Sequence, residues 1–230
     1  MSLFLNWNEE NYEYVLTTPG YIALALILVA VLVVIALLKK DNRQSLSAGE
    51  MSFCAAAIAL STVTSFIKFS SLPYGGSITL FSMLFICLTG YVFGTRIGVM
   101  TGVAYGMVQL ITGPYIYHPI QVILDYPAAF GALGLAGLFS RSKKGIIPGY
   151  LVGVLCRYAC HVVSGYVFFA SYAPEGTNPV IYTLGYNATY ILPEMIATIV
   201  VISIPAVTDA ISRIRLMFEQ ETAGMTQHNY

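Results

Sequence analysis

Residues 146–170 read IIPGYLVGVLCRYACHVVSGYVFFA, and this stretch decides the fold class. It is long enough to cross a bilayer as a helix, yet it carries a cation, Arg157, with His161 four residues later. Residues four apart share one face of a helix. An ionisable group inside a membrane-length apolar run is costly, so it usually faces the interior of a helix bundle. We therefore expect the Arg157–His161 face to form one wall of a ligand cavity.

Other polar and aromatic residues extend this wall. Ser164 and Phe168 fall on the same helical face, and Phe169 lies at its edge. Tyr182 and Asn187 enter the next apolar run, where they are placed to close the cavity. Polar and aromatic groups together suit a flat heteroaromatic ligand better than a bare ion.

The composition of the whole chain agrees with a membrane protein. Of its 230 residues, 57% are hydrophobic and 10% are charged, whereas a soluble domain carries about 25% charged residues. The formal net charge is zero, and we expect no nucleic-acid partner. The four cysteines all lie in apolar runs, where they are typical of small buried hydrophobes rather than of a metal site.

Seven apolar runs are candidate spans, and they predict an all-α polytopic membrane protein. They cover residues 21–38, 51–69, 77–93, 99–111, 120–139, 146–170 and 180–207. The run 21–38 has an acidic leading flank and no small-residue cleavage site, so we interpret it as an extra transmembrane helix and not as a signal peptide. We expect three regions: an outer tail with this helix (1–47), a six-helix membrane domain (48–207) and a cytoplasmic tail (208–230).

The distribution of cations predicts the orientation. Loops 39–50, 94–98 and 140–145 and the tail 208–230 hold Lys39, Lys40, Arg43, Arg96, Arg141, Lys143, Lys144, Arg213 and Arg215. Lys68 and Arg157 fall within predicted spans, so no connection on the other side carries Lys or Arg. By the positive-inside rule, the N-terminus is outside and the C-terminus is cytoplasmic. We interpret Lys68 as a side chain that reaches the interface from the outer end of its helix.

Two acidic residues also fall at membrane depth. Asp125 lies inside the run 120–139, where a carboxylate requires a cation, either Arg157 or a cationic ligand. An ion pair that only locks two helices and a ligand site both fit this pattern. Glu194 is a further buried ionisable residue, and the sequence does not choose between a supporting role in the site and contact with a partner protein.

The run 51–69 carries small residues at Ser52 and Ala56, four apart. Such small-xxx-small surfaces let helices approach closely. This pair is compatible with a docking surface for another membrane protein and with ordinary internal packing.

Two stretches resemble a known family. Residues 117–137, YHPIQVILDYPAAFGALGLAG, and 157–187, RYACHVVSGYVFFASYAPEGTNPVIYTLGYN, resemble the ThiT (YuaJ) family of thiamine-binding S components of energy-coupling factor (ECF) vitamin transporters. The resemblance covers residues 48–207 and implies a six-helix core in the bacterial cytoplasmic membrane. It also implies thiamine as the ligand, no cofactor, and three partners: a transmembrane coupling subunit and two ATPase subunits.

The resemblance also implies roles for individual residues. The family's binding glutamate falls on Asp125 with Tyr126 beside it, its lysine and histidine on Arg157 and His161, its stacking tryptophan on Phe169, and its Tyr and Asn on Tyr182 and Asn187. A further tryptophan falls near Gly76, where no ring is available. Ser52 and Ala56 fit the family's surface for docking the coupling subunit.

This assignment is physically coherent. Thiamine is a permanent cation with two flat rings, so a buried carboxylate neutralises it while Phe169, Tyr126 and Tyr182 stack or offer cation–π contact. We expect His161 and Asn187 to recognise ring nitrogens and the amine. Arg157 has the weakest case for a ligand contact, because it is also placed to hold Asp125.

Other functions are weighed against capture of thiamine for ATP-driven uptake. One alternative is a solo proton-coupled carrier with Asp125, Glu194 and His161 as its relay, and another is an S component for a different vitamin-like heteroaromatic ligand. No GxxxxGK[ST] loop occurs, so ATP hydrolysis requires separate subunits. A retinal photoreceptor is excluded because residues 180–207 contain no lysine, and no catalytic motif indicates an enzyme.

Overall fold

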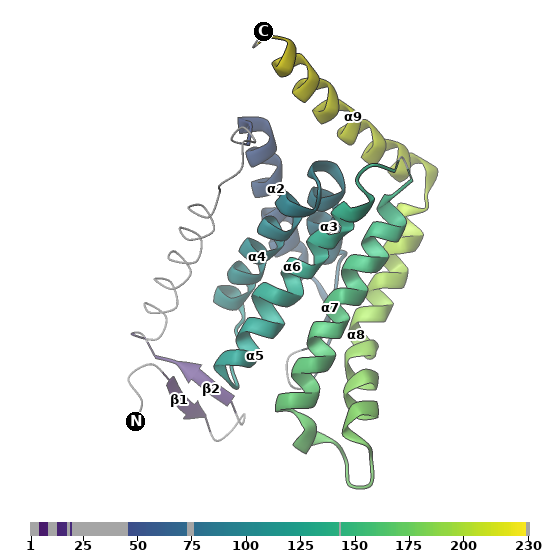
Figure 1. The fold of residues 1–230 in the computed structure, drawn as a ribbon. Helices are drawn as coiled ribbons and strands as arrows, with labels where there is room; N and C mark the ends of the chain where they lie inside the picture. The colour runs from purple at the N-terminus through teal and green to yellow at the C-terminus, as the bar shows by residue number, and fades with distance from the viewer. Residues whose placement is uncertain are drawn as a thin grey trace.

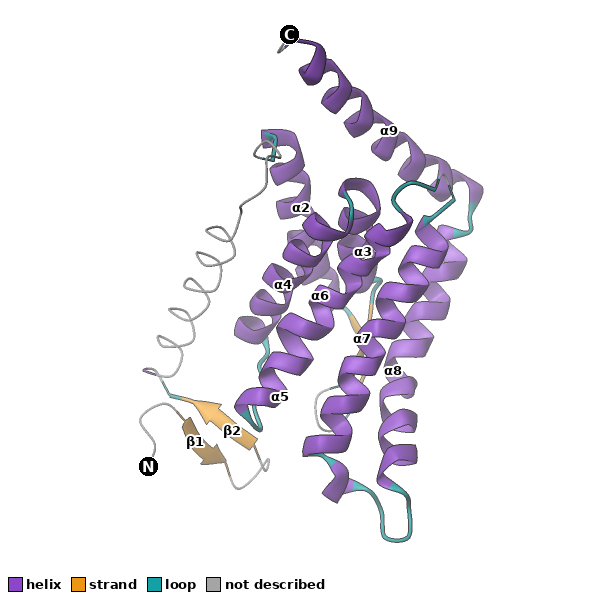
Figure 2. Cartoon of the chain, viewed as in Figure 1, coloured by secondary structure: helices purple, strands orange, loops and turns teal. Residues whose placement is uncertain are grey.

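The computed structural model describes residues 5–8, 13–17, 19, 46–72, 76–142 and 144–228, which form a helical bundle (Figures 1 and 2). The bundle contains α2 (Ala48–Phe66), α3 (Ser82–Phe93), α4 (Thr95–Thr112), the composite segment Pro119–Phe139, α7 (Ile146–Phe168) and α8 (Pro179–Ile202). Among the described residues, four of these, α2, Pro119–Phe139, α7 and α8, are long and apolar enough to cross a membrane, and α3 is a shorter apolar helix. The prediction of a helical polytopic membrane fold is confirmed. The extra helix predicted at 21–38 lies outside the described residues.

The outer surface of the bundle is apolar, as a lipid-facing surface requires. On α2, Leu60, Val63 and Phe66 are exposed, and its buried residues are the small Ala57, Ser61 and Ser65. The helix begins with a capping box, in which Ser47 and Glu50 each bond the other's backbone N–H. Its exposed apolar face is stable in a bilayer and costly in water.

The connection between α2 and α3 is a β-hairpin, whereas the sequence predicted a helix up to residue 69 and another from residue 77. Strand β3 (Lys68–Ser71) pairs antiparallel with β4 (Ser77–Thr79), because the backbone turns to an extended conformation at Ile67. The predicted helical limits at residues 69 and 77 are therefore wrong. Lys68 lies in the connection between α2 and α3 and not in a span. The sequence predicted that the connections on the outer side of the membrane carry no Lys or Arg, and this prediction is wrong at Lys68.

The segment Pro119–Phe139 is the least regular helix of the bundle. It passes through α5 (Pro119–Ile123), a π-helical turn η2 (Leu124–Ala128), α6 (Ala129–Leu133) and a 3₁₀ turn η3 (Gly134–Phe139). Pro127 lies inside the π turn and has no N–H to donate to a regular α-helical ladder. The turn fits closely against α4, where a Cβ on Gly106 would lie 2.6 Å from the carbonyl oxygen of Tyr126.

The other helix boundaries differ in ways that Gly and Pro explain. The residues 94–98, expected as a turn, are helical from Thr95 onward, and only Gly94 turns the chain, with φ 91°. The run predicted at 180–207 ends as a helix at Ile202, and Pro205 begins a separate helix, α9 (Pro205–His228).

Helix α9 docks on the end of the bundle opposite the α7–α8 loop (Figure 1). The ring of Phe218 packs edge-on against Phe53 and Phe93, at centroid distances of 5.5 and 4.9 Å. Arg215 Nη1 donates to the carbonyl oxygen of Ser142 at 2.8 Å. The first half of the expected C-terminal tail is thus a packed helix.

Strands β1 (Leu5–Asn8) and β2 (Glu13–Leu16) form an antiparallel hairpin near the N-terminus, which the sequence did not predict. The buried core lies between the helices and includes the aromatic residues Tyr91, Tyr105 and Tyr150.

Candidate functional site

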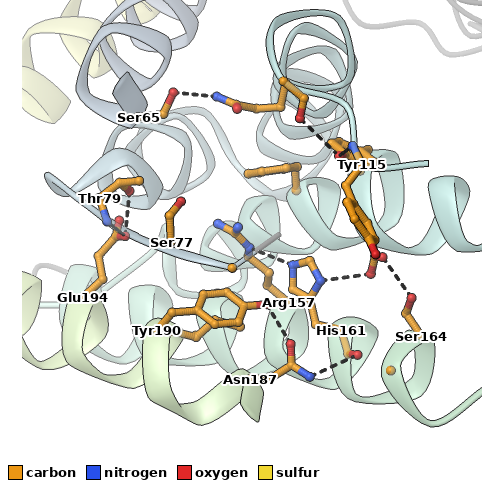
Figure 3. A pocket seen from close by; sticks show the side chains of 18 of the residues that line it. Ser65, Ser77, Thr79, Tyr115, Arg157, His161, Ser164, Asn187, Tyr190 and Glu194 are labelled. Atoms are coloured by element: carbon orange, nitrogen blue, oxygen red, sulfur yellow. Dashed lines mark hydrogen bonds and ion pairs between the residues drawn. The ribbon is translucent and has the colours of Figure 1, made fainter. Parts of the chain in front are cut away.

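A cavity of about 220 Å³ opens among α2, the β3–β4 hairpin, α4, the π turn, α7 and α8 (Figure 3). All seven residues that the sequence predicted as ligand-binding line it: Asp125, Tyr126, Arg157, His161, Phe169, Tyr182 and Asn187. Ser52 and Ala56 lie elsewhere, on the exposed face of α2.

The Asp125 carboxylate is held by three donors from two helical segments. Gln121 Nε2 donates to Oδ2 at 2.7 Å, Ser164 Oγ donates to Oδ2 at 2.9 Å, and His161 Nδ1 lies 3.0 Å from Oδ1. The Asp125 side chain is 16% exposed and lines the cavity.

The hydrogen bonds define the tautomer of His161. Arg157 Nε lies 3.3 Å from His161 Nε2, and a guanidinium is only a donor, so Nε2 must accept. The imidazole proton therefore lies on Nδ1 and is donated to Asp125. Both ring nitrogens are used within the protein, so His161 offers a ligand its ring face.

Arg157 supports Asp125 through His161. Within the described residues, Arg157 makes no direct ion pair with Asp125; its guanidinium instead lies 4.2 Å from the centroid of the Phe130 ring. The direct Asp125–Arg157 pair that the sequence left open is therefore wrong, because His161 stands between the two side chains.

Aromatic rings form part of the cavity wall. Phe169, at the C-terminal end of α7, lies within 5.2–5.9 Å of the Tyr115, Tyr117 and Tyr172 rings. Tyr126 accepts a hydrogen bond from the backbone N–H of Tyr115 at 2.7 Å, which ties the α4–α5 loop to the π turn. Phe169 lines the cavity, whereas its neighbour Phe168 stacks on His118.

Asn187 is largely engaged by the protein. Its Nδ2 donates to the backbone carbonyls of Thr183 and His161, and its Oδ1 accepts from Tyr190 at 2.7 Å. One lone pair of Oδ1 is left for a ligand donor. The Tyr190 ring also fills the space beside Gly76, where a Cβ would approach Cδ1 of that ring to 2.7 Å. Gly76 itself offers no ring, but the Tyr190 ring from α8 lies beside it.

Glu194 belongs to a second polar cluster, separate from the first in Figure 3. Its carboxylate accepts from the backbone and hydroxyl of Thr79, at 3.0 and 2.7 Å, and more weakly from Ser82 and Met83 at the start of α3. A carboxylate at a helix N-terminus is stabilised by the helix dipole. Glu194 therefore ties α8 to the hairpin and to α3.

The structure adds residues that the sequence did not single out as a part of the cavity. They include Gln121, Ser65, Tyr105, Gln109 and Tyr190. Gln121 lies four residues before Asp125, on the same helical face, and this spacing was a usable signal. Tyr105 and Gln109 lie four residues apart on α4, whereas Ser65 is on α2 and Tyr190 on α8, and no local pattern places these three helices together.

Comparison with known proteins agrees with this architecture. The family model described as thiamine transporter protein (Thia_YuaJ) matches residues 51–213. The chain belongs to this family. The family is one of transporters and not of enzymes, and the match confirms the resemblance that residues 117–137 and 157–187 indicated.

Individual members of the thiamine transporter family extend the comparison. Thiamine transporter ThiT of Bacillus subtilis is 39% identical over 162 residues, or 64% of this chain and 83% of the relative. The ThiT of Lacticaseibacillus paracasei is 33% identical over 120 residues, or 45% of this chain and 60% of the relative. A solved structure of ThiT from Listeria monocytogenes superposes with a TM-score of 0.60 and 25% identity, over 67% of this chain and 91% of that chain.

The family match includes the whole cavity. It ends at residue 213, within α9 and before Arg215 and Phe218. The contacts of Arg215 and Phe218 therefore lie beyond the matched region, whereas Ile211 of α9, which is buried in the core, lies within it.

Proposed function

We propose that this chain captures thiamine from outside the cell and acts as the substrate-binding subunit of an ECF-type complex that takes it up with energy from ATP. The observation that carries the proposal is the Asp125 carboxylate, held by three donors and facing a cavity ringed by aromatic side chains. The two relatives named ThiT are described as thiamine transporters.

The cavity suits a flat organic cation. A carboxylate at membrane depth favours a cationic partner, and among the described residues no Lys or Arg forms an ion pair with Asp125. Phe169, Tyr126 and Tyr182 supply ring faces for stacking and cation–π contact. A metal or alkali ion would need several oxygen ligands around it and would gain little from these rings.

Uptake against a gradient requires an energy source that this chain does not contain. The sequence has no GxxxxGK[ST] loop, so ATP hydrolysis belongs to separate ATPase subunits. We expect the exposed face of α2 around Ser52 and Ala56 to dock the transmembrane coupling subunit, because small residues permit close helix contact. Arg96 at the start of α4, Arg141 in the connection before α7 and Arg213 in α9 support a cytoplasmic location for that end of the bundle.

The solo proton-coupled carrier is less well supported. It requires a relay through Asp125, His161 and Glu194, but in the described part of the chain the bonds of the Glu194 carboxylate lead to Thr79, Ser82 and Met83. Those contacts serve the fold and do not connect the two clusters.

Calorimetry on the detergent-purified protein tests ligand capture. We expect thiamine to bind more tightly than its pyrimidine or thiazole half, and no detectable binding of thiamine would refute the proposal.

Uptake by cells tests the coupling. Uptake should require co-expression of the coupling and ATPase subunits, and the double variant Ser52→Leu and Ala56→Leu should bind thiamine but not support uptake. Ile196→Leu, a change at an exposed position of α8, is the matched control. Thiamine uptake by this chain alone, abolished by collapsing the proton gradient, would favour the solo carrier instead.

A further inference from the structure

Gln109 on α4 lines the same cavity, and its amide is bonded on one side only. Its Nε2 lies 2.9 Å from Ser65 Oγ and 2.7 Å from Tyr105 Oη. The two ends of a glutamine amide have nearly the same shape, so their orientation has to follow from the hydrogen-bond network. The network around Gln109 determines it.

Both hydroxyls beside Gln109 already donate elsewhere. Tyr105 Oη donates to the backbone carbonyl of Ser61 at 3.1 Å, and Ser65 Oγ donates to that of Thr62 at 2.7 Å. A carbonyl is only an acceptor and a hydroxyl has one hydrogen, so each hydroxyl can only accept from Gln109. The NH₂ end of the amide must face both, and Oε1 must face away from them.

The carbonyl end is consequently free for a ligand. Among the described residues, Gln109 Oε1 has no hydrogen-bond partner, and the side chain is half-buried on the cavity wall. Two other acceptors in the cavity are already bonded: Asp125 accepts three hydrogen bonds and Asn187 Oδ1 accepts one from Tyr190. Gln109 thus differs from them in keeping both lone pairs of its oxygen.

We propose that Gln109 is a specificity-determining residue whose Oε1 accepts a hydrogen bond from an N–H or O–H group of the bound ligand. This inference rests on the proposed function, since thiamine offers two such donors, the exocyclic amine of the pyrimidine and the terminal hydroxyl. In this arrangement Asp125 balances the positive charge of the ligand, and Gln109 accepts a hydrogen bond from an uncharged donor group of the ligand. A ligand without that donor leaves a half-buried polar oxygen facing it unpaired, which disfavours its binding.

Calorimetry with three ligands tests the proposal. The ligands are thiamine, an analogue with hydrogen in place of the exocyclic amine, and an analogue with methyl in place of the hydroxymethyl end. Gln109→Met keeps the length of the side chain and removes the acceptor. We expect Gln109→Met to weaken the binding of thiamine by roughly 5- to 100-fold. It should have almost no effect on the affinity for the analogue that lacks the group from which Gln109 accepts its hydrogen bond.

Two further variants separate this effect from loosened packing. Ser65→Ala breaks one bond of the amide but retains the acceptor, so any loss of affinity should be small and equal for the three ligands. Gln109→Glu retains acceptor oxygens and should keep the preference for the donor-bearing ligand, which provides the test if Gln109→Met does not fold.

An equal loss for all three ligands in Gln109→Met, or loss of the preference in Gln109→Glu, would overturn the assignment of Gln109 and leave the proposed function intact. Failure of the wild-type protein to bind thiamine would instead refute the proposed function.

Discussion

Asp125→Asn is the substitution that tests the site most directly, because it removes one charge and almost no volume. In the wild type, both carboxylate oxygens only accept, from Gln121, Ser164 and His161. An asparagine must place its NH₂ group at one of these positions. The position facing His161 is the less unfavourable, since the other faces two donors, yet His161 cannot turn its proton away while Arg157 donates to Nε2. One donor–donor contact therefore remains.

The two consequences of this substitution differ in magnitude. A carboxylate about 4 Å from the ligand cation contributes about 4 kcal/mol at an effective dielectric constant of about 20. Part of this gain offsets the hydration that the cation loses, so we expect the affinity for thiamine to fall by about 100-fold. The donor–donor contact exists in the free protein as well as in the complex, so it lowers the stability of both. For an uncharged ligand we expect a loss of less than about 10-fold.

Calorimetry with thiamine and with an isostere that carries a neutral five-membered ring separates the two effects. Ser164→Ala is the matched control, because it removes one donor and retains the charge, and it should weaken both ligands slightly and equally. Normal binding of thiamine by Asp125→Asn would show that the carboxylate serves only to pack the helices. An equal loss for the charged and the neutral ligand would refute the electrostatic argument.

Three other predictions follow from the same contacts. In ¹⁵N-histidine spectra, His161 should carry its proton on Nδ1, while His118, whose Nδ1 accepts from Ile120 N–H, should carry it on Nε2; two identical tautomers would contradict the assignment. Glu194→Gln should destabilise the protein by about 3 kcal/mol in thermal unfolding, because its NH₂ group would face the donors that now bond the carboxylate, and an unchanged melting temperature would contradict this. Phe218→Ala should cost about 1–2 kcal/mol of stability by the same measurement while leaving the affinity for thiamine unchanged, because the ring packs at the other end of the bundle.

The sequence predicted the parts of the cavity that one helix encodes. Arg157, His161 and Ser164 recur at helical spacing in an otherwise apolar run, and the structure places all three in one network. Asp125 was found for a related reason, since a charge at membrane depth requires a partner. These signals are local, because helix periodicity and the cost of burying charge are visible in the sequence itself.

The parts that the sequence did not predict depend on contacts between distant segments. Lys68 and Thr79 lie in strands because the hairpin is bonded to Glu194, more than a hundred residues away in the chain. The π turn at Asp125 depends on Pro127 and on the close approach of Gly106 on α4. Hydropathy shows that such segments are apolar. It does not predict their backbone geometry, which depends on the packing of neighbouring segments.

The position of Arg157 explains how a cation can serve a cavity for another cation. A guanidinium only donates, so His161 Nε2 accepts from Arg157 and the ring directs its Nδ1 proton onto Asp125. Its positive charge meanwhile lies over the face of Phe130, where the ring quadrupole partly balances it. Arg157 therefore orients the Asp125 side of the cavity through His161 and not through a direct ion pair. A direct Arg157–Asp125 pair would have neutralised the charge that the proposed ligand requires, which is the physical reason for placing His161 between them.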